Sequence, residues 1–334
     1  MIYPTGDRSS AFQSMKNGRD LTKNLNRLSQ NLSTGRPENL STHLSGRTAK
    51  AIGLDRELNR IDSFLEHNKN LEFFLGQQQR VLSSIGATLE TVGSQLLATS
   101  AGSSESQIEA GARISRESFD DVIGRLNSQS SGRALFAGAR FGVEPIIEPD
   151  EIISELKSLV VGEQSLDRVE EIIRDWFFDD VSGFGALAYV GSNGLATSQR
   201  VGGTDQNIES IRADDPAIRE VLASFSMGIV AGWSGLNVNG TSRAHFLQRA
   251  GEMMFNSNHS VIDVAARVGA SEEKIEFQND ILSTQRATFS KVHIDWTRLD
   301  TFDTASELQE AQRILELHYV AIARVSQLSL VNYI

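Results

Sequence analysis

Histidines and paired carboxylates are the side chains of this sequence that could bind a metal or transfer protons. The histidines are scattered, and no two of them have the i, i+4 spacing of a zinc site on a helix. They are His43, His67, His245, His259, His293 and His318. The acidic pairs Asp179–Asp180 and Asp214–Asp215 are typical of solvated loops and helix caps. No nucleophile elbow, P-loop or dinucleotide-binding glycine motif occurs, so we expect no enzyme activity, no cofactor and no metal site.

The stretch DVAARVGASEEKI, residues 263–275, has the residue types of a helix-turn-helix DNA-binding motif. Ala265, Gly269 and Ile275 would be its small residue, its turn glycine and its packing aliphatic residue. The recognition helix would also carry the carboxylates of Glu272, Glu273 and Glu276. These would repel DNA phosphates, and the formal net charge of −11 gives no basic surface to offset them. A DNA-binding regulator is therefore a disfavoured alternative, and we expect no nucleic-acid partner.

The composition favours long helices in a chain of 334 residues, which contains only 5 prolines and 7% aromatic residues. The absence of cysteine excludes disulfides and thiolate chemistry. The start, MIYPTGDRSSAFQSM, lacks the basic and apolar regions of a secretory signal peptide. No apolar run approaches the roughly 18 residues of a membrane span. We therefore expect no membrane insertion, and export, if it occurs, by another route.

The first hundred residues contain three leucine-rich segments with heptad-like spacing. Leu21, Leu25, Leu28 and Leu32 step by 4, 3 and 4, and a break follows at the STGRPEN segment, residues 33–39. The same spacing recurs from Leu54 to Leu65 and from Leu82 to Leu96. Three such segments in succession predict long helices that pack nearly parallel to their partners.

The C-terminal helix carries two adjacent apolar rows. The first row is Leu308, Ala311, Leu315, Ile322 and Val325, and the second is Ile314, Leu317, Ala321 and Leu328. A stripe of this width exceeds what a two-stranded coiled coil buries, so the helix needs partners on two sides. Some of those partners are expected to come from other subunits.

The middle of the chain, residues 145–239, is predicted to be a separate α+β outer domain. Two amphipathic helices begin it, and short strands are expected at 186–191, 196–202 and 206–213. Asp215 and Pro216 then predict the start of another helix. We expect this module to project outward from the rest of the chain.

The predicted fold class is mainly α, with long N- and C-terminal helices packed as an elongated coiled-coil-like rod. The helical rod domain would comprise residues 41–144 and 240–299, with a hairpin near 132–145. Residues 1–40 and 300–334 would be terminal assembly helices. Because residues 1–20 can bury little apolar surface, these terminal segments are expected to be disordered in the free monomer and to order on assembly.

Both ends of the chain resemble the bacterial flagellin family. The segment LDTFDTASELQEAQRILELHYVAIARVSQLSLVNYI, residues 299–334, is similar to the family's acidic segment and final helix, with the acidic positions shifted by one residue. The segment 24–62 resembles its leucine helix, S-T-G turn and second helix, although LSTHLSG replaces the usual S-x-D-D-P. GRALFAGARFGVEP, residues 132–145, resembles the G-x-x-L-F-A-G segment of the branch that joins hook to filament.

The resemblance implies a structural subunit of the flagellum that joins hook to filament by helical self-assembly. Its partners would be further copies in a ring or helical layer, another hook-associated protein on the hook side, flagellin on the filament side, and a cytoplasmic export chaperone on the C-terminal helix. It implies an extracellular location, reached by the flagellar type III route without a cleaved signal peptide. A minor flagellin within the filament itself is the alternative. The expected assembly contacts are Leu21, Leu25, Leu28, Leu32, Leu308, Leu315, Ile322, Val325 and Leu328.

Overall fold

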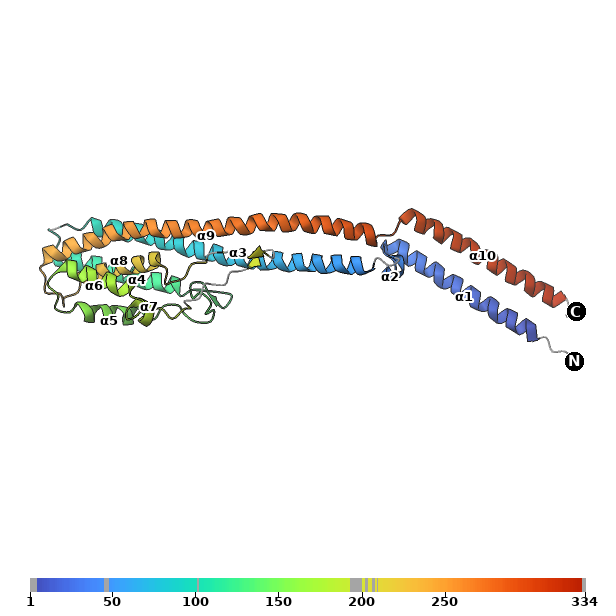
Figure 1. Ribbon diagram of the computed structural model, residues 1–334, viewed down its shortest axis with the longest axis horizontal. Coiled ribbons are helices and arrows are strands. Elements are labelled where there is room, and N and C mark those ends of the chain that lie inside the picture. The colour runs from blue at the N-terminus through green and yellow to red at the C-terminus, as the bar shows by residue number, and fades with distance from the viewer. Residues whose placement is uncertain are drawn as a thin grey trace. The chain divides into compact units, whose positions relative to one another are not determined.

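The computed structural model describes residues 5–44, 48–100, 102–192, 200–201, 204–205, 208 and 210–331 (Figure 1). Its helices are α1 (Thr5–Thr34), α2 (Leu40–His43), α3 (Thr48–Leu97), α4 (Glu105–Leu126), α5 (Pro149–Val160), α6 (Leu166–Phe178), α7 (Phe184–Leu187), α8 (Pro216–Ala231), α9 (Gly240–Thr297) and α10 (Thr301–Val331). Its strands are β1 (Gln129–Ser130), β2 (Arg133–Ala134), β3 (Arg200–Val201) and β4 (Thr204–Asp205). The prediction of a mainly α fold with long packed helices is confirmed.

The chain divides into two compact units. Unit 1 combines residues 1–62 with 283–334, and unit 2 comprises residues 63–282. The division between the two units falls within α3 and α9. The helices themselves are interrupted elsewhere, after α1 and before α10. The domain boundaries expected from the sequence at residues 40 and 299 stay a prediction.

Unit 2 is built on the antiparallel packing of α3 and α9. The leucine row predicted from Leu82 to Leu96 is buried throughout, with exposed fractions between 0 and 3%. Pairs of residues along the two helices show their direction: Gly93 lies against Gly251, and the Gln79 Nε2 donates to the carbonyl of Ala265 at 2.6 Å. The 3-4 spacing of these residues therefore predicted correctly which face of α3 is buried.

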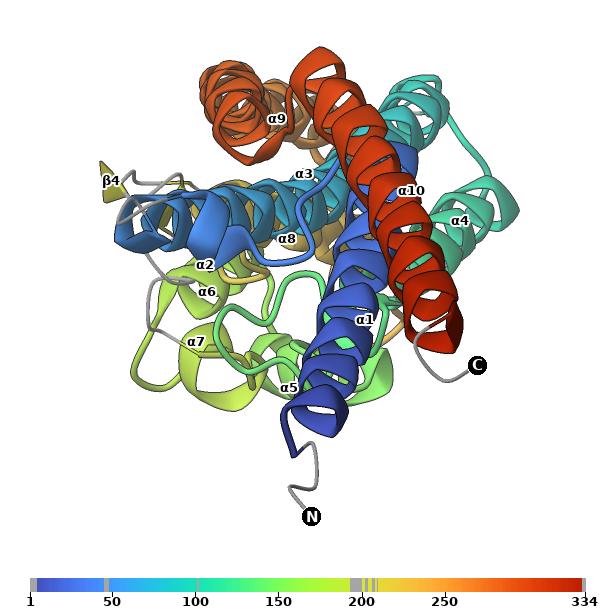
Figure 2. The ribbon, with the colours of Figure 1, turned by 90° about the vertical axis from the view of Figure 1, so that its right-hand side faces the viewer.

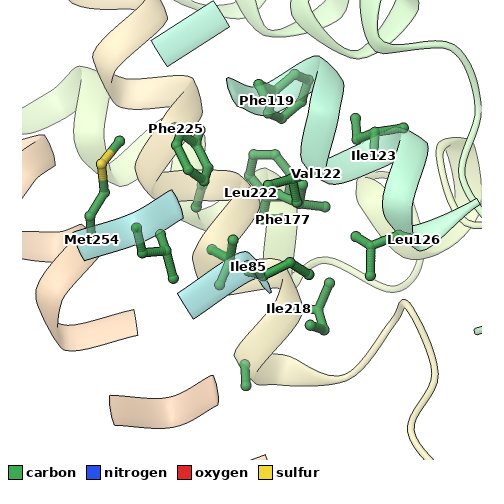
Figure 3. Close-up of a cluster of buried hydrophobic side chains, with 14 of the residues drawn as sticks. Ile85, Phe119, Val122, Ile123, Leu126, Phe177, Ile218, Leu222, Phe225 and Met254 are labelled. Atoms are coloured by element: carbon green, nitrogen blue, oxygen red, sulfur yellow. The ribbon is translucent and has the colours of Figure 1, made fainter. Parts of the chain in front are cut away.

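Segment 145–239 contributes to the same hydrophobic core, so the expectation that it projects outward is wrong. Helix α8 packs against α4 and α6, and 14 of its 16 residues are buried. Figure 3 shows side chains of α8 meeting those of α3, α4, α6 and α9, among them Ile85, Phe119, Phe177, Leu222 and Met254. A helix that is apolar on all sides can be stable only when other helices surround it.

The strand expected at residues 186–191 is also wrong. Residues 184–187 form the short helix α7, because the N–H groups of Leu187, Ala188 and Tyr189 find local acceptors in the carbonyls of Gly183 and Phe184. Tyr189 instead makes an isolated bridge to Ile146. The expected strand at 196–202 lies mostly outside the described residues, and the described residues between 208 and 213 form no strand.

A two-residue hairpin precedes the LFAG sequence. Its strands β1 and β2 pair antiparallel, and Ser131 and Gly132 between them have φ values of 51° and 75°. Two positive φ values in succession are the requirement of a type I′ turn, which glycine meets without strain. The buried residues Leu135, Phe136 and Ala137 follow directly, so the hairpin lies at the start of the 132–145 segment.

The helix-turn-helix alternative is excluded by the course of α9. Residues 263–275 lie within one uninterrupted helix, Gly240–Thr297, and Gly269 is a helical residue and not a turn. A Cβ atom on Gly269 would lie 3.3 Å from Nε2 of Gln79 in α3. Glycine at this position therefore leaves room for the Gln79 side chain, which accounts for the residue without DNA recognition.

Candidate assembly interface

The terminal helices α1 and α10 of unit 1 lie side by side and run antiparallel (Figures 1 and 2). The N–H of Leu299 donates to the carbonyl of Gly35 at 3.3 Å, just before α10 begins. Further along, Nε2 of His318 and the carbonyl oxygen of Ser14 are 3.0 Å apart. These two contacts align Leu308 with the leucines of α1, whereas Leu315 lies opposite the turn that precedes Leu21.

The first apolar row of α10 faces α1 along its first half. Leu28 of α1 is 3% exposed and Ala311 of α10 is 5% exposed. The other residues of this contact are half-buried: Leu21, Leu25, Leu32, Leu308 and Leu315. The pair of helices thus buries the predicted residues around Leu28 and Leu308 within a single copy of the chain.

The rest of the apolar surface of α10 stays exposed. Ile322 and Val325, of the first row, are 38% and 64% exposed, and Ile314 and Leu317, of the second row, are 40% and 54% exposed. The side chain of Leu328 lies outside the described residues. Isolated exposed apolar residues are ordinary, but a row that continues along a helix marks a contact surface.

Polar side chains fix where α10 begins. The Asp300 side chain accepts hydrogen bonds from the N–H groups of Phe302 and Asp303 at 2.8 and 3.2 Å. The hydroxyl of Thr304 donates to the Asp300 carbonyl at 2.6 Å, and Thr304 is only 6% exposed. Asp300, which belongs to the family-like acidic segment, is therefore an N-cap that holds the helix start.

The break between α1 and α2 is equally well defined. Gly35 has φ of 66°, and its N–H donates to the Asn31 carbonyl at 2.8 Å, which ends α1 in the manner of a C-terminal glycine cap. The buried Asn31 side chain accepts from the N–H of Glu38 at 2.8 Å. The predicted break at residues 33–39 is thus confirmed, and Asn31 is the residue that ties it to the helix.

An open groove of about 830 Å³ lies between this break and the start of α10. Its lining includes Arg27 and Asn31 from α1 and Asp303 and Glu307 from α10. Charges of both signs are therefore present around a space bordered by Leu28.

On the solvent face of α10, the Arg313 guanidinium lowers the pKa of Glu310 chiefly through a side-chain hydrogen bond.

His318 is a member of the interface that the sequence did not suggest. A Cβ atom on Gly18 would lie 3.2 Å from Nε2 of His318, so the glycine leaves the space in which the imidazole reaches the α1 backbone. An isolated glycine inside a helical pattern was the available signal, because such glycines often mark close packing.

The exposed apolar side chains of this surface can make packing contacts. Among the residues that the structure describes, no cluster of three His, Cys, Asp or Glu side chains could hold a metal ion. Of the described helices, none combines the length and the apolar character that a membrane span needs.

Comparisons with known proteins give distant structural similarities. No profile of a known protein family matches the sequence, and a search of curated proteins finds no match. Among solved structures, the chain is similar to a flagellar hook-associated protein from Vibrio parahaemolyticus, with 14% identity, a TM-score of 0.48, and coverage of 75% of this chain and 97% of that one. It is also similar to FlgL of Bacillus cereus, with 14% identity, a TM-score of 0.48, and coverage of 72% and 99%. Values this low do not establish a shared family.

Proposed function

We propose that this protein is a structural subunit of the bacterial flagellum that joins the hook to the filament, as hook-associated protein 3 does. The observation that carries the proposal is the apolar surface of α10 that remains exposed after α1 has packed against it. Ile314, Leu317 and Val325 extend along this surface and are between 40% and 64% exposed. Association with further copies would bury it, and head-to-tail contacts that do not close would produce a helical layer.

The resemblance of the two chain ends to the flagellin family supports the flagellar setting. Residues 299–334 carry the family-like acidic segment and tail, and residues 132–145 carry the segment typical of the junction branch. On this proposal the protein acts outside the cell, contacts a hook-associated protein on one side and flagellin on the other, and has no catalytic role. It would leave the cell by the flagellar type III route, with a chaperone on α10 before export.

A minor flagellin is the alternative within the same class. It would use the same terminal helices and would differ in its position along the filament. The LFAG sequence favours the junction role, because filament flagellins usually carry a different, N-G-rich segment there.

Deletion of the gene tests the proposal and separates the two roles. We expect electron microscopy to show hooks without filaments, and an immunoblot to show flagellin released into the medium. Reintroduction of the gene should restore the filaments. Filaments that persist with altered form would instead identify a minor flagellin, and unaffected flagella would refute both roles.

A further inference from the structure

Arg133, in the hairpin strand β2, lies between two aromatic rings. Its guanidinium carbon is 4.3 Å from the ring centre of Phe74 and 4.2 Å from that of Phe141. The Nε atom is buried without a hydrogen-bond partner, whereas the residue as a whole is only half-buried. Burial lowers the pKa of this arginine, which reflects the cost of removing water from its charge.

Arg133 differs in this respect from three other buried or half-buried arginines of unit 2. Arg219 pairs with Asp180 at 2.7 Å, Arg243 with Glu105 at 2.5 Å, and Arg212 with Asp214 at 2.8 Å. Within the described part of the chain, the Arg133 side chain makes no hydrogen bond and no ion pair. A partly desolvated cation without a counterion is costly, and the chain has 43 acidic residues that could have supplied one.

The backbone on either side of Arg133 is rigidly held. The N–H of Ala134 donates to the Phe141 carbonyl at 2.8 Å, and the N–H of Leu135 donates to the Ser128 carbonyl at 3.1 Å. The fully buried side chain of Gln78 donates to the Leu135 carbonyl at 2.5 Å. The guanidinium is thus fixed by two rings and by its strand before any partner arrives, so little ordering entropy would be lost on binding.

We propose that Arg133 is a receptor for a carboxylate from a second copy of this chain, bound by the two terminal nitrogens of the guanidinium. An arginine held in one plane offers two parallel N–H donors whose geometry matches a carboxylate. Phe141, which is 44% exposed, would be covered by the same contact.

A second copy is the occupant that the charges favour. The chain carries 43 acidic against 32 basic residues, so the surface of another copy offers many carboxylates and few competing cations. This inference rests on the proposed function in one respect, since it requires that copies assemble. It adds a contact in unit 2 that is separate from α1 and α10.

The test uses the full-length Arg133→Lys variant, assembled from a mixture of ¹⁵N-labelled and unlabelled chains. A carbodiimide couples a lysine amine to a carboxylate only when the two are in contact, and mass spectrometry then locates the amide. We expect a cross-link that joins position 133 of one copy to an Asp or Glu of another. Arg113→Lys, at an exposed position of α4, is the matched control and should give no such product.

A quantitative arm uses Arg133→Gln. Loss of the guanidinium should raise the critical concentration for assembly by at least about tenfold, while circular dichroism shows an unchanged fold. The inference is overturned if position 133 cross-links only within its own chain, if it gives no cross-link in assembled samples, or if folded Arg133→Gln assembles like the wild type. A wild type that never assembles would overturn the proposed function, and this inference with it.

Discussion

Gly93 of α3 and Gly251 of α9 face each other where these two helices pack together. A Cβ atom on Gly251 would lie 2.9 Å from the carbonyl oxygen of Gly93. A Cβ atom on Gly93 would lie 3.3 Å from the carbonyl oxygen of Gly251. For Gly251 the nearest obstacle is backbone, which cannot rotate away, so this contact limits how the two helices can be aligned.

Gly251→Ala is therefore expected to destabilise unit 2 by about 1–3 kcal/mol, since the added methyl group forces the helices apart. Gly124→Ala is the matched control, because Gly124 is an exposed glycine of α4 with open space around its Cα. This control should stabilise the protein by up to about 1 kcal/mol through higher helix propensity. Guanidinium unfolding followed by circular dichroism measures both effects, and equal stabilisation by the two substitutions would disprove the close packing.

The sequence predicted the helices and their apolar faces because these depend on local periodicity. The row from Leu82 to Leu96 is buried as its spacing indicated, and Gly35 ends α1 where a breaker was expected. The rows of α10 were also found from spacing alone. Which of them faces α1 could not be predicted, because both rows are similarly apolar and the choice depends on the partner helix.

The sequence did not predict the contacts between distant parts of the chain. Ala186 to Gly191 have the composition of a strand, yet the N–H groups of Ala186 to Tyr189 find acceptors within the same segment, at Gly183 and Phe184. The pairing of Gly93 with Gly251 depends on the alignment of helices more than 150 residues apart in sequence. Arg133 carried no signal either, since what distinguishes it is that its guanidinium has no ion-pair partner among the described residues.

Asn279 is expected to be important for stability through its hydrogen bond to Asn68. Asn68 is fully buried in α3, and its Nδ2 donates to Oδ1 of Asn279 in α9 at 2.7 Å. Asn279→Ala would leave this donor without a partner, at a cost of about 1–3 kcal/mol. The double substitution of both residues by leucine should recover that loss, because no polar atom would then remain buried.

Chemical unfolding of Asn68→Leu, Asn279→Leu and the double leucine variant tests this pair. The two residues should show a coupling energy in a double-mutant cycle, because they share one contact. Additive effects of the two substitutions would mean that the hydrogen bond contributes nothing. Because Oδ1 of Asn68 is buried without a hydrogen-bond partner, we expect the double leucine variant to be more stable than Asn279→Ala.

Glu272→Gln is expected to raise the melting temperature of unit 2 at neutral pH. Burial raises the pKa of Glu272, and the nearby Glu72 raises it further against the opposing effect of Arg80. A carboxyl whose folded-state pKa is raised favours folding only when protonated, so its contribution is present below the unfolded value of about 4.3 and is lost as the pH rises. The advantage of the variant should therefore be largest near pH 7 and shrink towards pH 4. Thermal unfolding between pH 4 and pH 7 measures the difference in melting temperature between the variant and the wild type. Glu273→Gln, at an exposed position, is the control. A rise in melting temperature that did not depend on pH would contradict the electrostatic cause.

Leu317→Asp separates assembly from the pairing of α1 with α10. Leu317 is 54% exposed, whereas Leu315 is half-buried and lies on the side of α10 that faces α1. A charge at either position opposes burial in a subunit contact. Leu317→Asp should therefore raise the critical concentration for assembly at least tenfold, and so should the double variant Leu315→Asp, Ile322→Asp. A tenfold change corresponds to a loss of about 1.4 kcal/mol of association free energy. Gln309→Asp introduces the same charge at an exposed position of α10 whose neighbours along the helix are mostly polar, and it should assemble normally. Sedimentation measures assembly, and thermal unfolding of unit 2 should be unchanged in all three variants because its core lies within residues 63–282. Normal assembly of Leu317→Asp, beside failure of the double variant, would show that only the first apolar row makes subunit contacts.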